Sequence, residues 1–327
     1  MKKIAFLIII SSILNYLNAQ IVNIPDINFK SYLVGNPDIN TNSDNEIQVS
    51  EAVAFTGTID CSDSNIFDLT GIEMFVNITK LWCYKNDLTT LHLSQNVNLE
   101  DLRCDYNQLK NLDTSHNVKL KTLLCAANKI AVLDLSKNLE LRYLACYENN
   151  LVNLDLHLNK NLERLDCGLN QLINLDIGGN LALKELSCGW NQLKQLNLKN
   201  GKNSILQVML ARGNSNLSCI QVDNVEESNS KINWAKDVTA SYSTDCNFMD
   251  VKDYYKKEIV LYPNPVKDIL NLSEEVSDIM IKDMSGKRIL EFTTSKTINL
   301  KSLPEGNYLI EFKNKLERTI IKKLIKH

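Results

Sequence analysis

Apolar residues recur through the middle of the chain in one fixed pattern. The unit Leu-x-x-Leu-x-Cys-x-x-Asn-x-Leu-x-x-Leu-x-Leu-x-x-Asn-x-x repeats every 21 residues from residue 59 to about 218. Its cysteines are spaced by 22 residues once and by 21 residues five times: Cys61, Cys83, Cys104, Cys125, Cys146, Cys167 and Cys188. An eighth copy, with Ala211 in the cysteine position, follows a two-residue insertion. Such periodicity is typical of a stacked solenoid, so we expect about eight repeats over residues 58–218.

The alternation within each unit predicts its local structure. The segment Leu-x-Cys has a period of two, so it should form a short strand whose leucine and cysteine face inward. Stacked copies would then make a parallel sheet. The second half of the unit, Leu-Asp-Leu followed by another asparagine, looks like a shortened first half. We therefore expect a mainly β fold, with extended chain or short strands on both sides and little helix.

Polar and thiol columns fit the inside of such a stack. Asparagine amides that turn inward at a bend can satisfy backbone groups of their own turn and of the neighbouring rung. The first column is Asn86, Asn107, Asn128, Asn149, Asn170, Asn191 and Asn214, and the second is Asn96, Asn117, Asn138, Asn159 and Asn180. Stacked strands hold their Cβ vectors parallel, whereas a disulfide needs them turned toward each other, so we expect buried thiols. Zinc would need convergent ligands rather than a line of them.

The repeat resembles the nested 21-residue class of bacterial leucine-rich repeats, in which a motif of 10 or 11 residues is doubled. The resemblance covers residues 59 to about 218 in eight copies. It implies a rigid, single-sided binding scaffold. Cys219 and Cys246 lie outside the column, in a segment without repeats. We predict that they form a disulfide closing a C-terminal cap over residues 219–247.

The N-terminus has the pattern of an export signal. Lys2 and Lys3 precede an apolar run over residues 4–14, and Ala19 offers a small residue before a cut ahead of Gln20. The run is too short to span a bilayer, which needs about 20 residues. We predict a signal peptide over residues 1–19 and a mature protein that does not span the membrane.

Residues 20–57 should cap the first repeat. Pro25-Asp26 begins a short amphipathic helix with Phe29, Tyr32 and Leu33 on one face. The segment after it matches the spacing of an EF-hand calcium loop. Its candidate ligands are Asn40, Asn42, Asp44, Glu46 and Glu51. The loop departs from the motif in its first position, which is Asn, and in its sixth, where Asn45 replaces the usual glycine. Asn tolerates the left-handed conformation, so calcium binding and a metal-free polar turn both remain open.

The last seventy residues have a different composition. We expect a linker over 248–258 and then short alternating strands that form a small β-sandwich over 259–327. Tyr262-Pro263-Asn264-Pro265, a Ser-Gly-Lys turn, Leu303-Pro304-Glu305-Gly306-Asn307-Tyr308 and a basic last strand resemble the C-terminal sorting domain of type IX secretion substrates. The resemblance implies contact with that secretion machinery and release to, or display on, the outer surface of a Gram-negative cell. An immunoglobulin-type binding module is the alternative.

Few residues suggest catalysis. The chain has no common nucleophile, metalloprotease or phosphate-loop motif, and its net charge of −3 does not suggest a nucleic-acid partner. Four histidines occupy unrelated positions and should be solvated: His92, His116, His157 and His327. A column of aspartates could accept hydrogen bonds from backbone amides of the turns or bind cations weakly: Asp113, Asp134, Asp155 and Asp176. A regular ladder offers no cleft with unequal carboxylates, so we do not expect an enzyme.

The outward positions beside each cysteine are rich in aromatic residues. They include Trp82, Tyr84, Arg103, Tyr106, Tyr143, Tyr147 and Trp190, a set that we call the aromatic face. Charged neighbours in the same columns are Asp105, Glu148, Arg164, Asp166 and Arg212. Exposed Trp, Tyr and Arg commonly anchor interfaces, and aromatic platforms suit sugar rings. We predict a secreted or surface protein that engages a protein or glycan here. The alternatives are aromatics that only shield the sheet, and a structural or adhesive role in the envelope or matrix.

Overall fold

The computed structural model describes residues 20–246, 259–284, 286–313 and 319–327. The chain divides into two compact units, Met1–Phe248 and Met249–His327, and each is treated by itself. The predicted signal peptide and the predicted linker lie outside the described residues.

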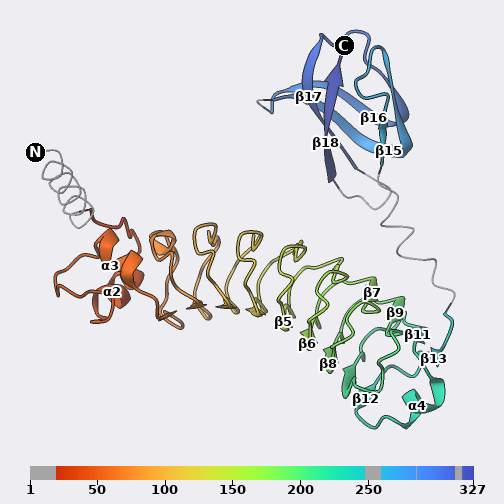
Figure 1. Cartoon of the computed structure of the whole chain (residues 1–327). Helices are drawn as coiled ribbons and strands as arrows, with labels where there is room; N and C mark the ends of the chain where they lie inside the picture. Colours follow the sequence, from red (N-terminus) through yellow and green to blue (C-terminus); the bar gives the residue numbers. More distant parts are fainter. Residues whose placement is uncertain (1–19, 247–258, 285, 314–318) are drawn as a thin grey trace, which may run out of the picture. The chain divides into compact units, whose positions relative to one another are not determined.

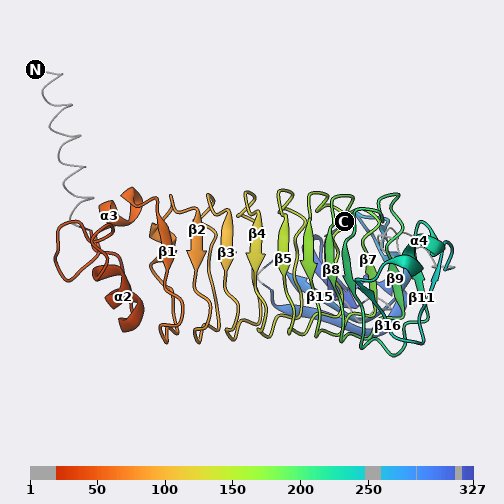
Figure 2. The ribbon, with the colours of Figure 1, turned by 90° about the horizontal axis from the view of Figure 1, so that it is seen from below.

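A parallel sheet of short strands runs along the first unit (Figures 1 and 2). Within the described residues its nine strands, in spatial order, are β1 Thr58–Asp60, β2 Lys80–Trp82, β3 Asp101–Arg103, β4 Thr122–Leu124, β5 Tyr143–Ala145, β6 Arg164–Asp166, β8 Glu185–Ser187, β10 Val208–Leu210 and β12 Trp234–Ala235. Leu81, Leu102 and Leu123 pair directly across β2, β3 and β4 and are fully buried. The leucine-rich-repeat solenoid is confirmed.

Strands β1 to β6 and β8 each end one residue before the cysteine that we expected them to contain. The ladder nevertheless continues, because the Cys83 N–H donates to the Arg103 carbonyl of the next rung at 2.8 Å. All seven column cysteines are buried free thiols, as predicted. Burial, followed by the charge of Asp60, raises the pKa of Cys61 to about 12.

Strands on the second side of the solenoid occur in its last rungs. They form a parallel sheet in the order β13 Ser241–Ser243, β11 Cys219–Gln221, β9 Gln195–Asn197 and β7 Asn174–Asp176. The second halves of the earlier rungs carry no strand within the described part of the chain. The cap segment therefore extends both sheets, through β12 on one side and β11 and β13 on the other.

Asparagine ladders hold neighbouring rungs together. The Asn107 Nδ2 group donates to the carbonyls of Cys83 at 3.0 Å and Cys104 at 3.1 Å, while its Oδ1 accepts from the Leu88 N–H at 3.0 Å. In the second ladder, Asn117 Nδ2 donates to the carbonyls of Leu93 and Asn96. The predicted role of the asparagines is confirmed: they satisfy backbone groups inside a turn that water does not reach.

Short helices close the N-terminal end. Helix α2, Ile27–Val34, begins at the N-cap Asp26, whose Oδ1 accepts from the N–H groups of Asn28 and Phe29. Phe29 and Leu33 are fully buried in the solenoid core. Helix α3, Val49–Ala54, and the 3-10 turn Ile72–Met74 follow.

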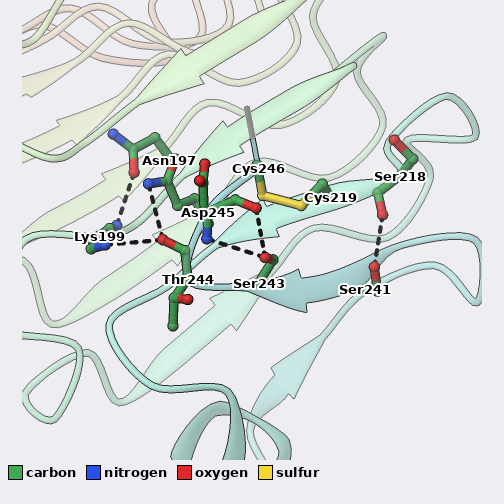
Figure 3. The surroundings of a disulfide bond; sticks show 10 residues. Asn197, Lys199, Ser218, Cys219, Ser241, Ser243, Thr244, Asp245 and Cys246 are labelled. Carbon is green, nitrogen blue, oxygen red and sulfur yellow. Dashed lines mark hydrogen bonds between the residues drawn. A yellow bond between two sulfur atoms is a disulfide. The ribbon is translucent and has the colours of Figure 1, made fainter. Parts of the chain in front are cut away.

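The other end carries helix α4, Val225–Ser230, and the predicted disulfide between Cys219 and Cys246 (Figure 3). Its S–S distance is 2.06 Å and it joins residues 27 apart. Asp223 also accepts from the backbone N–H groups of Asn200, Gly201 and Asn203, which ties the two-residue insertion to the cap.

The second unit is the expected small β domain. Its strands are β14 Leu261–Tyr262, β15 Ile269–Asp283, β16 Arg288–Asn299, β17 Gly306–Lys313 and β18 Thr319–Lys326. They belong to one antiparallel sheet, in which the long β15 pairs with β14, β16 and β17. Register shifts in β15 accompany these changes of partner, and Ile281, Ile310 and Phe312 lie in the core. The core of this unit is thus packed on a single sheet.

Candidate functional site

Every rung has one residue with an unusual backbone conformation, and two residues of the aromatic face, Tyr106 and Trp190, occupy this position. The residue two places after each cysteine position has a positive φ, from +50° to +81°: Asp63, Lys85, Tyr106, Ala127, Glu148, Leu169, Trp190 and Gly213. This left-handed turn lets the following residue, an asparagine in every rung after the first, enter the core. The conformation is unfavourable for residues with a Cβ. Only Gly213 in this column is free of that strain.

Exposure differs among the predicted face residues. Tyr106, Tyr143 and Trp190 are 48%, 43% and 69% exposed. Trp82, Tyr84, Arg103 and Tyr147 are half-buried. All seven lie outside the core, on or beside the strands of the nine-stranded sheet (Figure 2).

Trp82 and Arg103 form the first ordered pair. They lie opposite each other on β2 and β3, and the guanidinium carbon is 4.3 Å from the centroid of the indole ring. Asp101 fixes the same guanidinium through two hydrogen bonds of 3.1 Å. The Asp101 carboxylate therefore raises the pKa of Arg103. The cation–π contact and the ion pair together hold this cation over the ring.

Tyr106 and Tyr147 form the second pair. Their hydroxyl oxygens are 3.2 Å apart, although the residues are 41 positions apart in the chain. The hydrogen bond to Tyr106, and then burial, raise the pKa of Tyr147. Nearby Asp105 is half-buried, and desolvation raises the pKa of its carboxyl. The pair thus bridges the rung of Ala127, whose small side chain lies in the same column as Tyr106.

Trp190 lies against the last rung of the solenoid. A Cβ at Gly213 would come within 2.8 Å of Trp190 Cδ2, so the indole occupies the space that a side chain there would need. The backbone N–H of Trp190 donates to the backbone carbonyl of Arg212 at 2.9 Å. The ring is therefore positioned by the backbone of the following rung.

Two exposed leucines extend this surface beyond the predicted set. Leu169 is 50% exposed in the left-handed column, and Leu210 is 45% exposed on β10. Sequence reasoning passed over them because leucine elsewhere in the repeat marks the core. Their offsets in the repeat carried the signal. Leu169 lies two residues after a cysteine position and Leu210 lies one residue before one, and the repeat assigns neither offset to the core.

The N-terminal loop brings most of its predicted ligands together. Both Glu51 oxygens accept hydrogen bonds, Oε1 from the Thr41 and Asn42 N–H groups and Oε2 from that of Gln48. The Glu46 side chain instead pairs with Lys30 at 2.6 Å.

The left-handed residue in this loop is Ser43, with φ +61°, and not Asn45 as we expected. Asp44 accepts from the Glu46 N–H, which tightens the turn immediately after Ser43.

The remaining polar columns have structural roles. Each aspartate of the second half accepts from the N–H two residues later, as in the 2.9 Å contact of Asp113 with Ser115. All four histidines are exposed. Among the described residues, no cluster of three or more His, Cys, Asp or Glu side chains could hold a metal, and no helix there is long and apolar enough to cross a membrane.

Comparison with known proteins adds to both units. Residues 260–327 match the family model of a secretion system C-terminal sorting domain. Internalin J of Listeria monocytogenes is 50% identical over 46 residues, which span 14% of this chain and only 5% of internalin J.

Among solved structures, internalin C2 of Listeria monocytogenes aligns with a TM-score of 0.53 and 19% identity, over 69% of this chain and 98% of its own. The functional domain of internalin J, which includes a cysteine ladder, aligns with a TM-score of 0.29 and 18% identity, over 94% of this chain and 100% of its own. The internalin C2 alignment shows the fold. The chain therefore combines a leucine-rich-repeat solenoid with a secretion system C-terminal sorting domain, which marks it as a secreted or cell-surface protein.

Proposed function

We propose that this protein binds a partner protein across the aromatic face. The observation that carries the proposal is the placement of Tyr106 and Trp190. Both have left-handed backbones, at φ +53° and +56°, where glycine would cost less, and their side chains are 48% and 69% exposed. Large side chains in strained, solvated positions contribute little to the core. The backbone strain is shared by the whole column, because this turn places an asparagine in the core, whereas exposed aromatic side chains are typical of interfaces.

The chemistry of the face supports a protein partner. Tyr, Trp and Arg are the side chains enriched at the centre of protein interfaces. Arg103 is already fixed by Trp82 and Asp101, so its contact with a partner would cost little side-chain entropy. The surface of the same sheet carries side chains of both charge signs, because Arg164 pairs there with Glu185 at 3.2 Å.

The dimensions of the face point the same way. From Trp82 on β2 to the rung of Trp190 on β8 the sheet takes five strand steps, about 24 Å at ~4.8 Å per strand. An elongated surface of this kind suits a macromolecule, whereas small molecules bind in concave pockets.

The test is a binding screen with the full-length protein against an array that carries extracellular proteins and, separately, glycans. For any protein ligand found, Tyr106→Ala and Trp190→Ala should each weaken binding about 30-fold, the loss expected for a hot spot of ~2 kcal/mol. Leu139→Ala is the matched control, because Leu139 is 49% exposed but lies in the second half of its repeat. Unchanged affinity in both aromatic variants would overturn the proposal, as would hits confined to glycans.

Gly213→Ala provides an independent variant. It keeps every face residue, but its Cβ would collide with the Trp190 ring. We expect a displaced indole and weaker binding to the same ligand. If the screen finds no ligand and the protein is retained in the envelope or matrix, the structural or adhesive role is favoured.

We also propose that residues 259–327 direct the protein through the type IX secretion machinery, as their match to the sorting-domain family suggests. Deleting them should leave the protein in the periplasm. Normal secretion of the deleted form would contradict this assignment.

A further inference from the structure

The loop between α2 and α3 has the hydrogen-bond pattern of a closed polar turn. Counting Asn40 as the first position, Asn42, Asp44 and Glu51 fall at positions 3, 5 and 12, which supply side-chain oxygens in an EF-hand. Asn42 Oδ1 accepts from the Asp44 N–H at 2.9 Å, and Asp44 Oδ1 accepts from the Glu46 N–H at 2.7 Å. The Glu51 carboxylate reaches back to the N–H of Asn42 at 3.2 Å. Asn42 Nδ2 also donates to Asp44 Oδ2 at 2.9 Å, so these two side chains face each other in the loop.

Asn40 gives a separate indication that a ligand belongs there. It is only 5% exposed, and its Nδ2 donates to the carbonyls of Val34 at 3.0 Å and Asp44 at 2.8 Å. Because both partners are acceptors, the orientation of the amide is determined. Its Oδ1 is buried and accepts no hydrogen bond. The Nδ2 bond to Asp44 ties this amide to the loop, and a buried acceptor without a partner there is costly.

We propose that residues 40–51 bind one calcium ion. Its ligands are Asn40 Oδ1, the side-chain oxygens of Asn42, Asp44 and Glu51, and the backbone carbonyl of Glu46. An all-oxygen set from a flexible loop suits calcium, whereas magnesium demands a smaller octahedron and transition metals favour nitrogen or sulfur. The cation satisfies the orphaned oxygen of Asn40 and ties α2 to α3.

The charge of the loop sets the affinity. Only Asp44 and Glu51 contribute carboxylates, because the Glu46 side chain is held by Lys30 at 2.6 Å. Few charged ligands place the site in the weak class of extracellular modules, with a Kd of about 10⁻⁴ to 10⁻³ M. Such a site fills outside the cell, where calcium is plentiful.

The experiment is calorimetric titration of the metal-free, full-length protein with calcium chloride, with thermal unfolding measured in parallel. We expect one site of that affinity and a Tm that rises by several degrees between chelator and about 10 mM calcium. No binding heat and no change in Tm at that concentration would overturn the proposal. An equal response to magnesium would overturn the assignment of the metal.

Variants locate the site. Asp44→Asn and Glu51→Gln should each weaken binding at least about tenfold, since each removes a charged ligand. Asp113→Asn is the control, because it removes one carboxylate from an exposed position in the repeats and leaves the loop unchanged, and its affinity should stay within about twofold of the parent protein. Glu51 also holds the loop, so Lys30→Met guards against a variant that fails to fold. Removing this cation beside Asp44 should strengthen calcium binding. Weaker calcium binding in Lys30→Met, or a loss of affinity in Asp113→Asn equal to that in Asp44→Asn, would contradict the ligand assignment.

Discussion

Replacing one asparagine of the first ladder should destabilise the solenoid strongly. Asn107→Ala leaves the buried N–H of Leu88 without its partner. It also removes one of two amide donors from each of two carbonyls, because Asn86 still donates to Cys83 and Asn128 still donates to Cys104. Each buried polar group left unsatisfied costs about 1–3 kcal/mol. Losing one of two donors at each carbonyl adds a smaller cost, so we expect a loss of about 2–3 kcal/mol in the free energy of unfolding. The expected loss is therefore large for a single side chain.

The assay is urea unfolding of the full-length protein, followed by circular dichroism. Asn161→Ala serves as the control, because Asn161 is exposed and donates one hydrogen bond to the Leu139 carbonyl, so its loss should stay within about 0.5 kcal/mol. Asn107→Asp should be as harmful as Asn107→Ala, since a carboxylate would face two carbonyls in place of a donor. The reasoning fails if Asn107→Ala costs no more than the control, or if Asn107→Asp is neutral.

Three further predictions concern other parts of the molecule. Ala127→Gly should raise the free energy of unfolding, measured in urea titrations, by about 0.5–1 kcal/mol. Glycine relieves the strain of a left-handed alanine, ~1–2 kcal/mol, and this gain exceeds the cost of the added unfolded-state entropy, ~0.5–1 kcal/mol. A loss of stability would contradict this. The seven column thiols should resist iodoacetamide at pH 8 in the folded protein and all react after denaturation without reductant, because burial raises their pKa values; mass spectrometry showing modification of the native form would refute it. Burial raises the pKa of Asp26, but hydrogen bonds from Phe29, Phe67 and two further N–H groups lower it more, so its folded pKa lies below its ordinary value. Its contribution to stability is thus present above about pH 3.9 and lost as the pH falls through the folded pKa. Asp26→Asn should therefore lower the Tm at pH 7 and not at pH 2, and parallel Tm curves for the two proteins across that range would contradict it.

Much of the candidate site could be placed from the sequence. The 21-residue period identified the face on which Trp82, Tyr106 and Trp190 lie, because register in a stacked solenoid repeats with the sequence. The same period separated seven buried thiols from the two cysteines that form the cap disulfide. These are local or periodic properties, and a repeat architecture turns them directly into positions in space.

Side-chain partnerships depended on the tertiary structure. The hydroxyls of Tyr106 and Tyr147 meet across two rungs, and Arg103 stacks on Trp82 instead of extending into solvent. Neither contact can be read from spacing, since several rotamers are compatible with each position. The left-handed column was equally hidden, because its non-glycine residues carry no signal for a positive φ.

The N-terminal loop shows the same division. Its spacing indicated an oxygen-rich turn, but only the folded chain showed that Glu46 pairs with Lys30 and that Ser43 carries the left-handed backbone. The sequence alone thus determined the repeat, its inward columns and its sorting domain, because these depend on composition and period. Tertiary packing decided which polar atoms find partners and which, like Asn40 Oδ1, do not, since that choice depends on neighbours distant in the chain.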